Sequence, residues 1–180
     1  NTCERQGGWS DGVLKKMNRH YTAEEYLQKV ELIRSYFPDA AITTDVITGF
    51  PTETEEQFAE TCAFVRKVGF SQIHCFSYSR RTGTNAAKLA ELPAEVKSRR
   101  LHEMLAVAAQ LRADYEKQFI GRTLELVPEE RKGEYTVGYS QNYIRLYVSG
   151  EIAKKARVVA AQPFEDGLLA VQEAKGETNG

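Results

Sequence analysis

The feature that most constrains the fold is a strand, a helix and a second strand in direct succession. Residues 41–50, AITTDVITGF, form a β-rich run whose weak alternation is typical of a strand covered on both faces. Residues 70–79, FSQIHCFSYS, form the second strand. The helix between them is predicted to begin at Thr52 or Thr54 and to stop at Gly69. A crossover of this length predicts two parallel, neighbouring strands.

Further elements lie on either side of this unit. Thr22 is a predicted helix cap, Glu25 completes a capping box, and Pro38 ends that helix. Residues 93–121 predict a long amphipathic helix. From Arg122 onward the pattern changes to five short strands separated by turn residues. This last pattern predicts a small antiparallel β-barrel.

Composition limits the possible classes of protein. The 180 residues are 42% hydrophobic, which allows one or two cores, and the charges sum to −1, unlike a protein that coats DNA. There is no apolar run of about 20 residues and no signal peptide at the N-terminus, so we expect a cytoplasmic protein without a membrane partner. The sequence begins at Asn1 rather than methionine, which predicts a fragment or a processed chain.

The first 121 residues predict too few strands for a complete parallel sheet. Two strands would leave unpaired edges and exposed apolar surface. We therefore expect an α/β fold in which an incomplete (β/α) barrel, whose full form takes roughly 200 residues or more, precedes the small barrel. The alternative is a compact α+β domain that takes an extra strand from residues 1–8.

The loops after the two strands are the first candidate site. Residues 49–52 and 77–84 should meet at one mouth, because the carboxyl ends of parallel strands share an edge. Gly49 would let a ligand approach the backbone, and the following helix would offer free N–H groups. Three acids follow, Glu53, Glu55 and Glu56, and we interpret them as helix-end residues rather than catalytic ones.

Four stretches carry a resemblance to a known family. They are QGGWSDGVLKKMNRHYTAEEYLQ, AAITTDVITGFPTETEEQFAET, VGFSQIHCFSYSRRTGTNAA, and GYSQNYIRLYV with FEDGLLAV. In order and spacing they resemble the radical S-adenosylmethionine methylthiotransferases that end in a TRAM domain. The wording is most similar to the branch acting on threonylcarbamoyladenosine next to the tRNA anticodon. The branches acting on isopentenyladenosine and on a ribosomal protein share much of it.

The resemblance implies residue roles. Residues 45–54 match the family's D-x-I-x-G-F-P-G-E-T turn, which implies that Val46, Ile47 and Gly49 line the S-adenosylmethionine site. The end of the second strand, Phe76, Ser77 and Tyr78, should lie beside the adenine. These are positioning residues, so no catalytic residue is assigned in this chain and the cofactors supply the chemistry.

Departures from the family also count. Thr52 replaces the usual glycine, Thr82 an often-seen proline, and QGGWSD the usual QSGSD. The Cys-x-x-x-Cys-x-x-Cys motif that holds a 4Fe–4S cluster is absent, and so is the amino-terminal domain that binds a second cluster. We assign no metal ligand and expect this chain alone to be inactive. A non-catalytic RNA-binding remnant and an unrelated phosphate-binding α/β protein are the alternatives.

The terminal barrel is the second candidate site. In NYIRLYVSG, period-2 alternation predicts Tyr143, Arg145 and Tyr147 on the outer face, a pattern suited to stacking on bases and contacting phosphate. With the mouth residues Arg80 and Arg81, they are the predicted contacts to a tRNA anticodon stem-loop. The expected domains are an incomplete radical barrel (1–120), a TRAM barrel (121–174) and a disordered tail (175–180).

Overall fold

The computed structural model describes residues 5–7, 9–16, 22–80 and 83–173. The chain divides into two compact units, Asn1–Arg112 and Ala113–Gly180. This division assigns the end of the long helix to the second unit, whereas the sequence places the boundary after residue 120. The expected tail, residues 175–180, lies outside the described residues.

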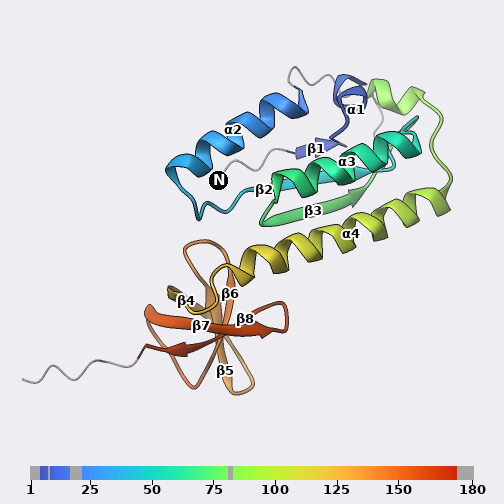
Figure 1. The fold of residues 1–180 in the computed structure, drawn as a ribbon. Helices are drawn as coiled ribbons and strands as arrows, with labels where there is room; N and C mark the ends of the chain where they lie inside the picture. Colours follow the sequence, from blue (N-terminus) through green and yellow to red (C-terminus); the bar gives the residue numbers. More distant parts are fainter. Residues whose placement is uncertain (1–4, 8, 17–21, 81–82, 174–180) are drawn as a thin grey trace, which may run out of the picture. The chain divides into compact units, whose positions relative to one another are not determined.

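The first unit combines helices with a parallel sheet (Figure 1). Its elements are β1 (Arg5–Gly7), α1 (Asp11–Lys16), α2 (Ala23–Tyr36), β2 (Thr43–Thr48), α3 (Glu55–Val68), β3 (Gln72–Ser77), the 3-10 helix η1 (Asn85–Lys88) and the part of α4 (Ala94–Lys117) that precedes Ala113. In the described residues the sheet has three strands in the order β1-β2-β3, and both pairings are parallel. The predicted parallel neighbours β2 and β3 are therefore confirmed. The strand β1 comes from the segment that the α+β alternative had named.

Local sequence signals fix the ends of the helices. Thr22 caps α2 in a capping box with Glu25, as predicted. Thr54, rather than Thr52, caps α3 and forms a capping box with Gln57. Gly69 ends α3 in the left-handed conformation.

One face of the sheet packs on the helices. Val46, Ile73 and Cys75 contact a core that includes residues of α1, α2, α3 and α4. Trp9, which belongs to the departure QGGWSD, is 1% exposed and is the largest fully buried side chain. The opposite face carries His74 and Phe76, both exposed. The expectation of two covered faces concerned β2, whose residues are all buried or half-buried, whereas β3 exposes one face.

The second unit is a closed barrel. Its strands are β4 (Thr123–Lys132), β5 (Tyr135–Tyr139), β6 (Arg145–Ser149), β7 (Ala156–Phe164) and β8 (Gly167–Gln172). In the described residues they close in the order β4-β5-β6-β8-β7, and every pairing is antiparallel except β6 with β8. The predicted small barrel is confirmed, with this one parallel pair as the difference.

The predicted outer stripe of the barrel is wrong in one respect. Tyr147 is 1% exposed, because Tyr135 and Phe164 cover it, with ring centroids 6.2 and 5.2 Å away. Period-2 alternation gives the face on which a side chain lies, and neighbours on that face decide whether it reaches solvent.

Among the helices of the described residues, none is long and apolar enough to cross a membrane.

Candidate functional site

A tight turn follows β2. The Glu53 amide donates a hydrogen bond to the Phe50 carbonyl (2.9 Å), which closes a turn with Pro51 and Thr52 at its centre. Thr52 has φ +67°, a left-handed conformation that a β-branched residue adopts at a cost. Proline followed by a residue with positive φ is the pattern of a type II turn, which favours glycine at the second central position. Thr52 thus occupies a position whose backbone suits glycine, the residue that the resemblance places there.

Gly49 also has a packing role that the sequence did not indicate. Its φ is +71°, and a Cβ atom there would lie 2.8 Å from Cγ of Lys97 on α4. Its N–H donates to Oε2 of Glu53 at 3.0 Å. The space beside Gly49 is therefore filled by the protein's own lysine, and glycine is required for that packing.

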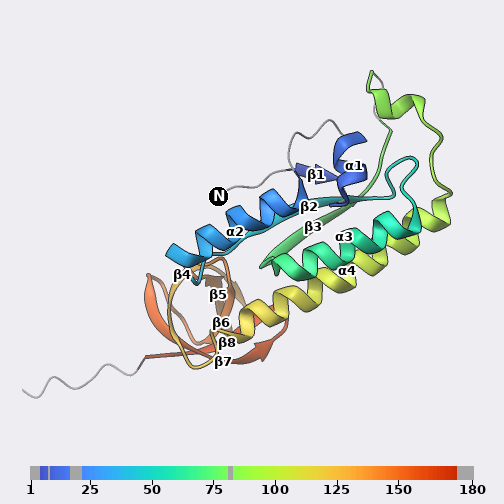
Figure 2. The same ribbon diagram turned by 45° about the horizontal axis from the view of Figure 1, so that its top comes forward.

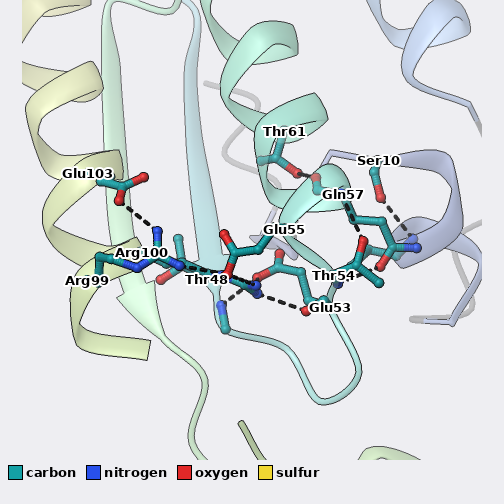
Figure 3. A network of polar contacts seen from close by, with 12 residues as sticks. Ser10, Thr48, Glu53, Thr54, Glu55, Gln57, Thr61, Arg99, Arg100 and Glu103 are labelled. Carbon is teal, nitrogen blue, oxygen red and sulfur yellow. Dashed lines mark hydrogen bonds and ion pairs between the residues drawn. The ribbon is translucent and has the colours of Figure 1, made fainter. Parts of the chain in front are cut away.

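Glu53 and Arg100 form a buried ion pair beneath the turn (Figure 3). Arg100 Nη1 donates to Glu53 Oε2 at 2.7 Å and to the Glu53 carbonyl at 2.9 Å. Both side chains are at most 2% exposed. Burial raises the pKa of the Glu53 carboxyl, and the hydrogen bonds from Arg100 and Gly49 offset this only in part. The pair ties α4 to the turn, so the prediction of Glu53 as a helix-end acid is wrong.

The neighbouring acids fit the helix-end interpretation better. Glu55, in the first turn of α3, accepts hydrogen bonds from Arg100 (2.8 Å) and Arg99 (2.6 Å), which lower the pKa of its carboxyl. These contacts join the start of α3 to α4, which runs beside it (Figure 2). Hydrogen bonds to its own backbone N–H and to Thr54 lower the pKa of Glu56.

The same corner offers little to a phosphate ligand. The N–H of Gly49 is bonded to Glu53, and the N–H of Gln57 is bonded to the Thr54 hydroxyl at 3.2 Å. Three carboxylates also lie at or beside this helix end, and they would repel an anion. The geometry therefore argues against the phosphate-binding alternative.

The open face of the sheet brings other predicted residues together. Ile47 on β2 pairs in register with Phe76 on β3, so both side chains lie on the same face. Ile47 is half-buried and Phe76 is 51% exposed. Val46 is fully buried among the helices, which leaves only its backbone for contact with a ligand on this face.

Tyr78 lies beyond the end of β3. Its N–H donates to the Thr48 carbonyl at 2.9 Å, and its ring packs edge-on against Phe50 at 5.5 Å. The Tyr78 hydroxyl is buried and has no hydrogen-bond partner in the described structure. A buried hydroxyl without a partner can accept a polar ligand atom, and Phe76 with Ile47 offers apolar surface on the open face of the same sheet. Ser77, which lies between Phe76 and Tyr78 in the sequence, is exposed.

The predicted basic pair is described only in part. Arg80 Nε donates to Glu91 Oε1 at 2.8 Å, and Lys97 Nζ donates to Glu91 Oε2 at 2.8 Å. These hydrogen bonds lower the pKa of the Glu91 carboxyl, with Lys97 having the larger effect. Arg81 lies outside the described residues.

On the barrel, the arginine of the predicted stripe is paired with acids. Arg145 donates to Asp166 (3.0 Å) and Glu130 (2.7 Å), and the Tyr147 hydroxyl donates to Asp166. Burial, followed by the Asp166 hydrogen bond, raises the pKa of Tyr147 to about 12. Arg145 and Tyr147 therefore form a polar cluster that holds the outer wall together.

Tyr143 is presented differently. It precedes β6 with φ +60° and is 59% exposed. The Ser140 hydroxyl accepts hydrogen bonds from the N–H groups of Asn142 and Ile144, and the Ser140 carbonyl accepts one from Tyr143. The loop is therefore fixed locally while it exposes an aromatic ring.

The comparisons with known proteins cover both units. The Radical SAM superfamily model matches residues 6–65. Threonylcarbamoyladenosine tRNA methylthiotransferase MtaB of Bacillus subtilis is 38% identical over 170 residues, which is 88% of this chain and 38% of that protein. This match is longer than either unit. The chain belongs to the radical S-adenosylmethionine methylthiotransferase family.

Two proteins named tRNA-2-methylthio-N(6)-dimethylallyladenosine synthase also match this methylthiotransferase family member. That of Desulfitobacterium hafniense is 38% identical over 79% of this chain and 33% of its own length, and that of Geobacillus thermodenitrificans 46% over 67% and 23%.

The chain thus spans less than two fifths of the length of these methylthiotransferases. The described residues do not fit an iron–sulfur cluster. Cys62 and Cys75 lie against the core, and burial raises the pKa of both thiols, that of Cys75 to about 11, whereas a cluster binds thiolates. Among these residues no group of three or more histidine, cysteine or acidic side chains could hold a metal ion.

Sequence reasoning missed two residues that shape the site of this methylthiotransferase family member. Arg100 appears in the sequence as one of several surface charges, and Glu53 as one of three helix-end acids. For Glu53 the sequence did hold a signal, because this residue precedes the Thr54 cap and lies outside the helix, where an acid gains little from the helix dipole. No pattern in the sequence indicated that Ser140 fixes the Tyr143 loop.

Proposed function

We propose that this chain works as part of a tRNA methylthiotransferase that adds a methylthio group to a modified adenosine next to the anticodon. The observation that carries the proposal is the 170-residue match to the Bacillus subtilis threonylcarbamoyladenosine tRNA methylthiotransferase, since it is longer than either unit. The substrate nucleoside that we propose is threonylcarbamoyladenosine, the one in the name of that relative. Because tRNA is that substrate, we place the protein in the cytoplasm.

In this proposal the open sheet face is one wall of the S-adenosylmethionine site. Ile47 and Phe76 offer apolar contacts, and the Tyr78 hydroxyl offers a hydrogen bond to a polar atom. S-adenosylmethionine, when bound, supplies the radical chemistry and the methyl group. The residues of this chain orient it and keep water from one side. The Glu53–Arg100 pair keeps the Gly49 turn in place at the end of β2.

The cluster ligands have no counterpart among the described residues, so we propose that the chain alone is inactive. The rest of the enzyme, including the parts that hold the clusters, would come from sequence corresponding to the remainder of the relatives. We propose no role in cluster chemistry for Cys62 or Cys75, because burial raises the pKa of both thiols and so disfavours the thiolates that bind iron.

The barrel would act as the TRAM domain and hold the anticodon stem-loop. Tyr143 replaces the predicted three-residue stripe as its main contact, because Arg145 is paired with acids and Tyr147 is buried. A fixed loop that exposes one aromatic ring loses little entropy when a base stacks on it. Stacking of this kind contributes about 1–3 kcal/mol per base.

The test is the affinity of the chain for a tRNA anticodon stem-loop, measured by fluorescence anisotropy. Tyr143→Ala should lower it about tenfold or more, which corresponds to the loss of one stacked base. Tyr36→Ala is the matched control, because Tyr36 on α2 is even more exposed, at 73%. Equal losses in the two variants, or none, would remove the barrel from the tRNA contact.

The affinity for modified stem-loops also tests to which branch of the methylthiotransferase family the chain belongs. Stem-loops that carry threonylcarbamoyladenosine, isopentenyladenosine or unmodified adenosine are compared at one salt concentration. The proposal expects the tightest binding for threonylcarbamoyladenosine. A preference for isopentenyladenosine would assign the chain to the branch named in the second group of relatives.

A further inference from the structure

We propose that Arg80 and Lys97 form a binding site for a backbone phosphate of the RNA substrate, and that Glu91 occupies this site in the free protein. The inference rests on the proposed function for the identity of the ligand, since RNA supplies the phosphate. It assigns a role to an acid that neither the motif nor the family resemblance singles out.

The geometry is that of an anion held by two cations. The Glu91 carboxylate accepts from Arg80 through one oxygen and from Lys97 through the other, each at 2.8 Å. A phosphate presents two unesterified oxygens in a similar arrangement, and guanidinium and ammonium groups are its usual partners. The carboxylate therefore stands where a phosphate would bind.

Lys97 is prepared for this role by its packing. Its stem lies against Gly49, in the space that a Cβ atom would need, and its side chain is only 19% exposed. The ammonium group is thus held near the end of β2. Arg80 follows Tyr78 by two residues, so it comes from the end of the neighbouring strand. The two cations meet at the edge of the sheet where the proposed cofactor wall lies.

Glu91 is free to leave without breaking an element of secondary structure. It lies between η1 and α4, in neither a helix nor a strand. The site has two positive charges and one negative charge, so a net positive charge attracts RNA even when Glu91 is in place. When a phosphate enters, it takes over both cations and Glu91 moves to water.

The first experiment compares wild type with Glu91→Gln in the 180-residue chain. The variant removes the competing charge, so its affinity for an anticodon stem-loop should rise severalfold at low salt. The dependence of log affinity on log salt should steepen by about 1 to 2, because up to two more cations become available for phosphate. Glu95→Gln is the control: it removes an exposed carboxylate from the start of α4 and should change affinity and slope less. Unchanged affinity in Glu91→Gln, or equal gains in the two variants, would overturn the proposal.

A second variant tests the partnership. Arg80→Gln should weaken binding more in the Glu91→Gln background than in wild type, because Arg80 is occupied by Glu91 only in the latter. Equal losses in both backgrounds would contradict the exchange of Glu91 for phosphate.

Inorganic tripolyphosphate, titrated by calorimetry, separates this inference from the proposed function. Tighter binding of tripolyphosphate to Glu91→Gln than to wild type supports the anion site even if neither protein binds the stem-loop, a result that would overturn only the RNA function. Stem-loop binding that Glu91→Gln leaves unchanged would overturn the anion site and leave the RNA function standing.

Discussion

The two units solve the problem of sheet edges in opposite ways. The barrel closes on itself, so each of its strands is paired on both sides within the described structure. The sheet of the first unit ends at β1 and β3, and one of its faces exposes Phe76. In the first unit a buried charge pair holds the turn that follows β2, whereas in the barrel the backbones approach closely, as at Gly138 and Val127. Among the described residues the barrel thus leaves no strand edge unpaired, whereas the sheet has two edge strands and one face that exposes Phe76.

Removal of the buried charge pair should have the largest effect. Arg100→Ala leaves the Glu53 carboxylate buried without its main partner, which should cost about 3–5 kcal/mol of the unfolding free energy of the first unit. Urea unfolding followed by the fluorescence of Trp9, the single tryptophan and buried in this unit, measures it. Arg99→Ala, which removes half-exposed pairs, should cost less than about 1 kcal/mol. Equal costs would mean that burial of Glu53 is unimportant.

The cost of Arg100→Ala should also depend on pH. Burial already raises the pKa of Glu53, and loss of Arg100 removes the largest opposing contribution. A carboxyl whose folded pKa lies above its unfolded value disfavours folding at neutral pH, and the penalty disappears as pH falls and the folded group binds a proton. The difference between wild type and variant should therefore shrink from pH 8 to pH 5. A constant difference would contradict this origin.

A side chain at Gly138, where the backbones of β4 and β5 approach closely, should lower the stability of the barrel. A Cβ atom at Gly138 would lie 2.0 Å from the Val127 carbonyl oxygen, so Gly138→Ala should cost about 3 kcal/mol or more. The loss should appear in the near-ultraviolet circular dichroism of the barrel tyrosines and leave Trp9 fluorescence unchanged. Gly133→Asn is the control, because nothing lies within 4 Å and asparagine tolerates its φ of +61°. Loss of the Trp9 signal in Gly138→Ala would show that the units do not unfold separately.

The turn after β2 should gain stability from glycine. Thr52→Gly relieves a β-branched residue at φ +67° and should stabilise the first unit by about 1 kcal/mol, read from Trp9 unfolding. Glu165→Gly makes the same change at φ +51° in the β7–β8 turn of the barrel, where the residue is not β-branched. The gain there should be smaller. A loss of stability in Thr52→Gly would mean that the threonine side chain contributes more than its backbone costs.

The smallest expected effect concerns Tyr147. Its folded pKa of about 12 exceeds the ordinary value of 10, so its contribution to barrel stability is complete below pH 10 and is lost as pH rises toward 12. Tyr147→Phe loses the hydrogen bond to Asp166, at about 1 kcal/mol near neutral pH. Above pH 10 the gap between wild type and variant should narrow, as seen in urea unfolding followed by circular dichroism. If the difference in unfolding free energy between wild type and Tyr147→Phe widened above pH 10, the ionisation that lowers stability would not be that of Tyr147.

How far the sequence predicts the structure depends on the range of the interactions. The cap Thr22 and the stop Gly69 act within one helical turn, and the sequence predicts them, while for the second helix it leaves Thr52 and Thr54 as alternatives. Val46 and Ile47 face opposite sides of the sheet, but a strand without clear alternation does not show which side is the core. The pairing of Glu53 with Arg100, 47 residues later, depends on how α4 packs, and no local pattern encodes it.

The barrel shows the same limit. Alternation in NYIRLYV identifies Ile144, Leu146 and Val148 as buried, which the structure confirms. It does not reveal that Phe164, from β7, covers Tyr147, because that contact depends on the closure of the barrel. Tyr143 stays exposed because it lies outside the strand, in a loop with positive φ.

We propose that the open sheet face belongs to the cofactor site of a tRNA methylthiotransferase. The most direct measurement replaces the matching segment of the Bacillus subtilis relative with residues 1–180 and analyses tRNA nucleosides by mass spectrometry in cells that lack their own enzyme. We expect that methylthio-threonylcarbamoyladenosine appears, that Phe76→Ala lowers it at least tenfold, and that Val127→Ala, at an exposed barrel valine, leaves it unchanged. If a folded chimera with intact clusters made no product, or if Phe76→Ala left its product level unchanged, the open sheet face would not be part of the cofactor site.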